Sequence, residues 1–169
     1  MKINAGFERV SRKQFSEDMA KFFPGISAGE MYENIQLPVR ATAGSAGYDI
    51  FTPVPFCLAP GEGVTIPTGL RVRIEGEWFL MCCPRSGLGV KYRLHLDNTV
   101  GIIDSDYYGA ENEGHILIKI SNGSPDKTLS LSAGERFAQG IFLPYGVCDG
   151  DTVYGIRTGG FGSTSGGSQ

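Results

Sequence analysis

Apolar and polar side chains alternate in short runs through most of the chain after residue 35, and glycine, proline, asparagine and aspartate separate the runs. Residues 70–74 alternate apolar side chains with arginines, and residues 116–121 place three isoleucines at every second position. A period of two is typical of a strand with one face in a core, and short strands between frequent turns are typical of an antiparallel sandwich or barrel. We therefore expect an all-β domain, with further strands at residues 77–83, 128–132 and 136–143 and turns at residues 60–61, 123–126 and 133–134.

In the segment before residue 24, the apolar residues recur with the period of an α-helix instead. Ser11 is placed to cap a helix with Gln14 reaching back to it, and Val10 and Phe15 are placed to close a hydrophobic staple. The apolar stripe of this helix and the pair that ends it are Phe15, Met19, Phe22, Phe23 and Pro24-Gly25. We expect the helix to pack on the domain surface or on a partner subunit, with residues 1–34 as a helical extension and residues 35–154 as the β domain.

Composition limits the partners and the location of the protein. The chain has 169 residues, 41% of them hydrophobic, and a net charge of −3. A protein that coats nucleic acid or an anionic membrane needs a dominant basic field, so we expect neither partner, and any phosphate must be bound locally. The longest apolar run, residues 78–83, is too short to span a bilayer, and the first residues lack a signal peptide's apolar segment. We therefore expect a cytoplasmic protein.

The sequence lacks the residues that several common catalytic sites require. The four cysteines have no CxxC spacing, and we expect reduced thiols that lie mostly in the core. Two histidines give little material for a zinc cage or a histidine-dependent triad. The chain has no GxxxxGK[ST] phosphate loop and no GxGxxG dinucleotide motif.

Three segments could bind phosphate. Residues 44–51, GSAGYDIF, place Asp49 at the start of a strand, where an aspartate is either a local cap or a metal contact. Residues 84–92, PRSGLGVKY, offer a guanidinium, a hydroxyl and free backbone N–H groups to one phosphate oxygen. Residues 134–142, GERFAQGIF, place Gln139 among apolar neighbours, so its amide must bond another strand or a ligand.

Residues 96–109, LDNTVGIIDSDYYG, are the richest segment in possible chemistry. Asn98 and Asp104 flank a short apolar turn. A carboxylate held near apolar groups can orient a water molecule for attack, whereas the plainer interpretation is a hairpin with Asn and Asp as turn formers.

Residues 157–167, RTGGFGSTSGG, place one arginine and one phenylalanine in a glycine and serine tail. Arginine offers a forked donor to phosphate, phenylalanine offers a flat face to a base, and glycine lets successive N–H groups converge on an anion. We expect residues 155–169 to form a flexible arm that closes over a nucleotide, and the alternative is a flexible terminus without a ligand.

Taken in order, these five segments resemble the five ordered motifs of the trimeric dUTPase family, over roughly residues 35–166. The resemblance implies a homotrimer of jelly-roll-like, distorted β-barrel subunits whose active sites are shared between subunits. It also implies Mg²⁺-dependent hydrolysis of dUTP to dUMP and pyrophosphate, by water attack on the α-phosphorus.

The resemblance also implies roles for individual residues. Asp49 looks like the carboxylate that holds the hydrated magnesium, Asp104 like the catalytic aspartate that orients the water and contacts the 3′-hydroxyl, and Tyr107 like the residue that packs on the deoxyribose. Arg157 resembles a phosphate clamp and Phe161 a ring laid over uracil. The remaining expected substrate contacts are Arg85, Ser86, Gly87 and Gln139 near the phosphates, Asn98, Gly101, Ile102, Ile103 and Leu117 around uracil, and Gly162 and Ser163 in the tail.

Parts of the chain depart from this pattern. Arg157 lies closer to Phe161 than in the family form RGxGGFG. Residues 110–114, AENEG, resemble an insertion, and because they are acidic we expect a solvated bulge. The extension before residue 35 lies outside the resemblance, and we expect it to serve packing or assembly.

Two alternatives remain open. A dCTP deaminase, with or without diphosphatase activity, resembles the same fold, although residues 115–120 contribute no glutamate for deamination. The other alternative is a dUTP-sensing regulatory protein that uses the N-terminal helix as a surface for a protein partner.

Overall fold

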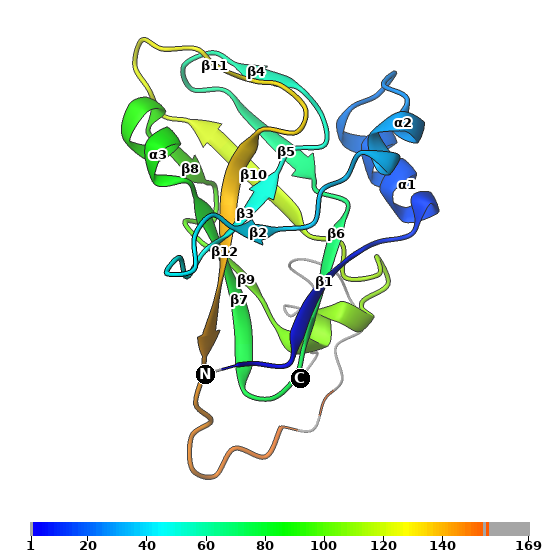
Figure 1. Ribbon diagram of the computed structural model, residues 1–169, viewed down its shortest axis with the longest axis vertical. Helices are drawn as coiled ribbons and strands as arrows, with labels where there is room; N and C mark the ends of the chain where they lie inside the picture. Colours follow the sequence, from blue (N-terminus) through cyan, green and yellow to red (C-terminus); the bar gives the residue numbers. More distant parts are fainter. Residues whose placement is uncertain (1, 154, 156–169) are drawn as a thin grey trace, which may run out of the picture.

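The computed structural model describes residues 2–153 and residue 155 (Figure 1). Strands make up 37% and helices 19% of the protein, and the predicted jelly-roll-like β fold is confirmed. Within the described residues the strands form four separate sheets, and no closed barrel is present. No helix in this part of the chain is long and apolar enough to cross a membrane.

The largest sheet is antiparallel and carries three of the predicted motifs. Its order is β2 (Val39–Arg40), β3 (Tyr48–Phe51), β12 (Arg136–Pro144), β7 (Trp78–Pro84) and β9 (Gly101–Ile103). A second sheet has the order β5 (Gly63–Pro67), β10 (Leu117–Asn122) and β8 (Leu94–Leu96), and two-stranded sheets pair β11 (Leu129–Leu131) with β4 (Phe56–Leu58) and β1 (Ala5–Arg9) with β6 (Leu70–Ile74). The predicted strands are therefore present, and their ends differ from the prediction by at most one residue.

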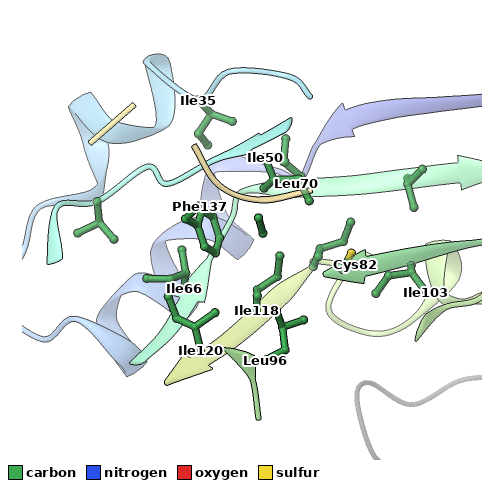
Figure 2. Close-up of a cluster of buried hydrophobic side chains, with 14 of the residues drawn as sticks. Ile35, Ile50, Ile66, Leu70, Cys82, Leu96, Ile103, Ile118, Ile120 and Phe137 are labelled. Carbon is green, nitrogen blue, oxygen red and sulfur yellow. The ribbon is translucent and has the colours of Figure 1, made fainter. Parts of the chain in front are cut away.

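The core lies between the sheets, where apolar side chains from different strands meet (Figure 2). The alternation in β6 is direct: Leu70, Val72 and Ile74 are buried, while the two arginines between them are half-buried. In β10 the buried positions are Ile118 and Ile120. Of the four cysteines only Cys82 is buried, so the expectation that these thiols lie mostly in the core is wrong.

The predicted N-terminal helix is present as α1 (Arg12–Phe22), and a second helix, α2 (Ala28–Glu33), follows it. The Ser11 hydroxyl accepts a bond from the Gln14 backbone N–H at 3.1 Å, as expected for the cap. Gln14 does not reach back, however, because its side chain donates to Asp18 Oδ2 at 2.9 Å. Glu113 takes that place instead, and its Oε2 accepts from the Ser11 N–H at 2.7 Å.

The expectation of a solvated bulge at residues 110–114 is therefore wrong. This loop packs against the N-terminal segment, and its last residue, Gly114, is buried. The next residue, His115, is also buried and extends the contact: its Nδ1 lies 2.5 Å from Asp18 Oδ2, and its Nε2 accepts from the Gly69 N–H at 2.8 Å. Because Nε2 accepts, the proton is on Nδ1 and is donated to Asp18.

Replacing Glu113 by Gln is expected to lower the free energy of unfolding by about 1 kcal/mol near neutral pH, as for a partly exposed charged hydrogen bond. The hydrogen bonds from Ser11 hold the pKa of Glu113 below its ordinary value of 4.5. A carboxylate with a lowered pKa stabilises the fold above its ordinary pKa, and this contribution is lost as pH falls through the folded pKa. Urea unfolding at about pH 7 and about pH 3 should show a difference between variant and wild type only at the higher pH. An equal difference at both values would contradict the assignment.

Candidate active site

Asp49 lies in β3 between two cationic side chains. It exposes only 7% of its surface, and the strand register places it opposite Gln139 of β12. Arg85 Nε lies 3.1 Å from Asp49 Oδ1, and Arg136 Nη1 lies 3.4 Å from Oδ2. Two guanidinium groups against one carboxylate leave a net positive charge here, which suits an anionic ligand.

A pocket of about 380 Å³ opens beside this carboxylate. Its lining brings together residues from three of the predicted motifs, and the residues are Ala41, Ser45, Ala46, Gly47, Asp49, Arg85, Ser86, Gln139 and Ile141. Gln139 Nε2 donates to the Pro84 carbonyl at 3.2 Å, so the predicted need for a partner is met by the neighbouring strand. The amide oxygen of Gln139 occupies the space that a side chain at position 47 would need, which explains the glycine there.

The segment after Arg85 is a short helix, α3 (Ser86–Tyr92). Arg85 precedes it with extended backbone, at φ −70° and ψ 136°. Ser86 and Gly87 therefore begin the helix, where backbone N–H groups have no intrahelical acceptor. Both residues are exposed, so these N–H groups are accessible to a ligand.

A second pocket, of about 400 Å³, lies beside the hairpin that joins β8 to β9. Four of the predicted uracil contacts line it, Asn98, Gly101, Ile103 and Leu117, whereas Ile102 is on the opposite face of β9 and is 43% exposed. The other lining residues are Thr65, Cys82, Leu96, Asp97, Ile116, Ile118 and Lys119. The hairpin reverses sharply because Thr99 adopts a positive φ of 67° and its N–H bonds the Leu96 carbonyl at 2.9 Å.

The charged residues of this second pocket are Asp97 and Lys119. Lys119 Nζ lies 2.8 Å from Asp97 Oδ2, and the Ser121 hydroxyl donates to Oδ1 at 2.6 Å. These contacts, from Lys119 above all, lower the pKa of Asp97. Burial raises the pKa of the Cys82 thiol to about 12, so this cysteine is a neutral part of the wall. The pocket is therefore mainly apolar, with fixed backbone groups from the hairpin.

Asp104 follows this hairpin directly. It is exposed and precedes the short helix η1 (Ser105–Gly109), and its carboxylate does not cap that helix. Tyr107 lies within η1 and is only 2% exposed, with its hydroxyl donating to the His115 carbonyl at 2.8 Å. The ring of Tyr107 is therefore held rigidly in the helix that follows Asp104. Within one chain almost none of this ring is accessible to a ligand.

Within one chain the structure places most of the described site residues in two separate pockets, whereas Gly87, Ile102, Asp104 and Tyr107 line neither of them. The pocket at Asp49 and the pocket at the hairpin share no lining residue. The predicted tail contacts Arg157, Phe161, Gly162 and Ser163 lie outside the described residues.

Sequence reasoning missed three charged residues, two that line the second pocket and one that contacts Asp49 in the first. Arg136 contacts Asp49 because β12 pairs with β3. Its presence in the GERFAQGIF segment was the sequence signal that could have suggested this contact. Lys119 lies in β10 and Asp97 follows β8, which pairs with β10, so these opposite charges meet only in the folded sheet and no local sequence pattern revealed them.

A β fold that combines a cationic pocket with a mainly apolar pocket defines a protein that binds a phosphorylated ligand carrying a flat ring. A family model described as dUTPase matches residues 33–164, and the chain belongs to the dUTPase family.

Similar proteins agree with this. The chain is 42% identical over 145 residues to the deoxyuridine 5′-triphosphate nucleotidohydrolase of Lactococcus lactis, covering 83% of this chain and 96% of that protein. It is 38% identical to the enzyme of the same name from Sodalis glossinidius, covering 77% and 87%. The crystal structure of dUTPase from Streptococcus mutans superposes with a TM-score of 0.65 at 34% identity, covering 86% and 99%. The predicted identity as a dUTP-hydrolysing enzyme is confirmed.

Proposed function

We propose that the chain is a Mg²⁺-dependent dUTP diphosphatase that binds the triphosphate at Asp49, Arg85 and Gln139 and the base at the hairpin of Asn98. The observation that carries this proposal is the pocket of about 380 Å³ in which Asp49 is paired with two arginines. Three separate family motifs meet in this pocket, although they are far apart in the sequence.

A hydrated magnesium ion fits the donor set at Asp49. The described residues hold no group of three or more His, Cys, Asp or Glu side chains that could enclose a metal. Mg²⁺ retains several waters and is commonly held by one or two carboxylates together with substrate phosphates, so a single aspartate suffices. Bound Mg²⁺ would offset the charge of the triphosphate and help to orient it.

The remaining steps, which are phosphate binding, proton transfer and sugar selection, are assigned to residues of this chain. Arg85 offers a fork of donors to phosphate oxygens, and Ser86 adds a hydroxyl together with accessible N–H groups. Asp104 accepts a proton from the water that attacks the α-phosphorus, and the leaving group is pyrophosphate. Tyr107, held by its hydrogen bond to His115, keeps η1 rigid next to Asp104, and its proposed contact with the deoxyribose is limited to the small part of the ring that is exposed.

Base selection follows from the hairpin. Its fixed backbone donors and acceptors suit uracil, and a base with the wrong hydrogen-bonding edge leaves buried groups unpaired, which gives discrimination of order 10⁴ to 10⁵. Gly101 lies so close to Cys82 that an added Cβ would be 3.2 Å from the Cβ of that cysteine. A hairpin packed this tightly against β7 resists the extra methyl of thymine.

We include a homotrimer with shared active sites, working in the cytoplasm, in this proposal. The separation of the two pockets within one chain supports a site completed by other copies. The edge strands of the largest sheet also expose apolar side chains, with Val39 of β2 50% and Ile102 of β9 43% exposed. Exposed apolar side chains on edge strands suit burial against another chain.

The deciding experiment measures pyrophosphate release from dUTP, dCTP, dTTP and UTP, with Mg²⁺ and then with a chelator. We expect rapid, metal-dependent release from dUTP alone. Ammonia release from dCTP would favour the deaminase alternative. Tight binding of dUTP without any release would favour the regulatory alternative.

A further inference from the structure

The segment that carries Asp104 is joined to the loop of residues 110–114 by successive backbone hydrogen bonds. The Tyr107 N–H donates to the Asp104 carbonyl at 3.2 Å, and the Ala110 N–H donates to the Tyr107 carbonyl at 3.1 Å. The Glu113 N–H then donates to the Ala110 carbonyl at 2.8 Å. A displacement of Glu113 is thus transmitted through three turns of backbone to Asp104.

Glu113 is fixed at the other end by the N-terminal helix. Its two carboxylate oxygens accept from the Ser11 N–H at 2.7 Å and from the Ser11 hydroxyl at 2.6 Å. The residue adopts a left-handed φ of 58°, a conformation that costs a glutamate about 1 kcal/mol or more and needs compensating contacts. The two bonds to Ser11 are the only side-chain hydrogen bonds of Glu113 within the described residues, so Ser11 holds the Glu113 end of the loop, while Asn112 Nδ2 donates to the Tyr107 hydroxyl at 2.8 Å.

The loop is also packed tightly beneath η1. Gly114 has a φ of 69°, and a Cβ there would lie 2.7 Å from the Tyr107 carbonyl oxygen and 2.8 Å from Tyr108 Cα. No gap is left between loop and helix, and a shift of the loop must therefore move η1.

Further side-chain contacts hold the same region against the N-terminal segment. The Tyr108 hydroxyl donates to Glu8 Oε2 of β1 at 2.8 Å, and Arg71 of β6 bonds both of these residues. On the other side, Asp18 of α1 bonds His115, whose carbonyl accepts from Tyr107. The segment after Asp104 is therefore supported by residues of β1 and α1, which precede the family match at residue 33.

We propose that Glu113 is a positioning residue for Asp104, and that its bond to Ser11 makes the N-terminal helix a support of the active site. The inference rests on the proposed role of Asp104. Glu113 does not touch the substrate and acts only by holding η1 and the backbone that leads to Asp104.

The test compares Glu113→Ala with Glu111→Ala in the full-length protein. Glu111 lies in the same loop, is exposed and makes no side-chain hydrogen bond with a described residue, so it is the matched control. We expect Glu113→Ala to lower kcat about tenfold with KM for dUTP changed less than about twofold, because displacement of a catalytic group by ~1 Å can cost up to about 100-fold. Glu113→Gln retains one acceptor and should recover part of the loss, and Glu111→Ala should match wild type.

Ser11→Ala tests the same contact from the helix. Ser11→Ala removes the hydroxyl bond to Glu113 and the cap of α1, and it leaves the bond from the Ser11 backbone N–H. In the Glu113→Ala background the hydroxyl bond is already absent, so the double variant should lose no more kcat per active site than Glu113→Ala alone. Active sites are counted by titration with a non-hydrolysable dUTP analogue, so that a loss of folded protein is not taken for a loss of kcat. If Glu113→Ala does not fold, the kcat of Glu113→Gln decides the matter.

Normal kcat in folded Glu113→Ala or, where that variant does not fold, in Glu113→Gln would overturn the inference, and so would additive losses in the double variant. Failure of the proposed role of Asp104 would look different. In that case Asp104→Asn would itself retain turnover, whatever the Glu113 variants do.

Discussion

Asp104→Asn is expected to lower kcat for dUTP about 1,000-fold, because the amide cannot accept the proton of the attacking water and general base catalysis contributes about 10² to 10⁴. The fold should survive, since asparagine is as good a residue as aspartate at a helix N-cap, the position that Asp104 holds before η1. Binding of a non-hydrolysable dUTP analogue should therefore remain measurable. Steady-state pyrophosphate release and calorimetric titration give the two quantities.

Asp106→Asn is the matched control. Asp106 lies in the first turn of η1, is exposed, and differs from Asp104 chiefly in its position relative to the hairpin. Its replacement should leave kcat within about twofold of wild type, because a surface substitution away from the site has little effect. Normal turnover by Asp104→Asn would refute the assigned role, and an equal loss in Asp106→Asn would indicate a general effect of charge.

A chain ending at Tyr154 is expected to lose nearly all turnover while it still folds and assembles. The proposed arm, residues 155–169, supplies Arg157 to the phosphates and Phe161 to the base, and closure of such a segment excludes water and completes the site. The core of the described residues lies within residues 5–144, all of which the shorter chain retains.

A chain ending at Gly167 retains the whole RTGGFGSTSGG segment and serves as the control. It should behave as wild type. Size-exclusion chromatography with light scattering checks the assembly of both chains. Full activity in the shorter chain would show that the arm is not needed for catalysis.

The strands that form the site could be predicted because their local patterns are strong. The alternation in residues 70–74 matched β6 at both ends, and residues 136–143 matched β12 to within one residue. The hairpin at Asn98 was also predictable, since turn-forming residues interrupt two apolar runs. These features depend on side chains that are close together in the sequence.

Other elements were missed because tertiary contacts determine them. β1 has half-buried residues without alternation, and it forms by pairing with β6. The helix α3 contains Gly87 and Gly89, and each glycine disfavours a helix by about 1 kcal/mol, so the sequence alone favoured a turn. Likewise, no local pattern reveals the contact of Glu113 with Ser11, since 102 positions separate them.

The docking of α1 also has a consequence for the order of events during synthesis. Ser11 and Asp18 leave the ribosome early, whereas their partners Glu113 and His115 follow 102 and 97 positions later. Synthesis proceeds at about 5–20 residues per second, so several seconds pass before Glu113 and His115 are available to bond Ser11 and Asp18. The contacts of α1 with Glu113 and His115 are thus among its last to form, and they form together with the backbone that leads to Asp104.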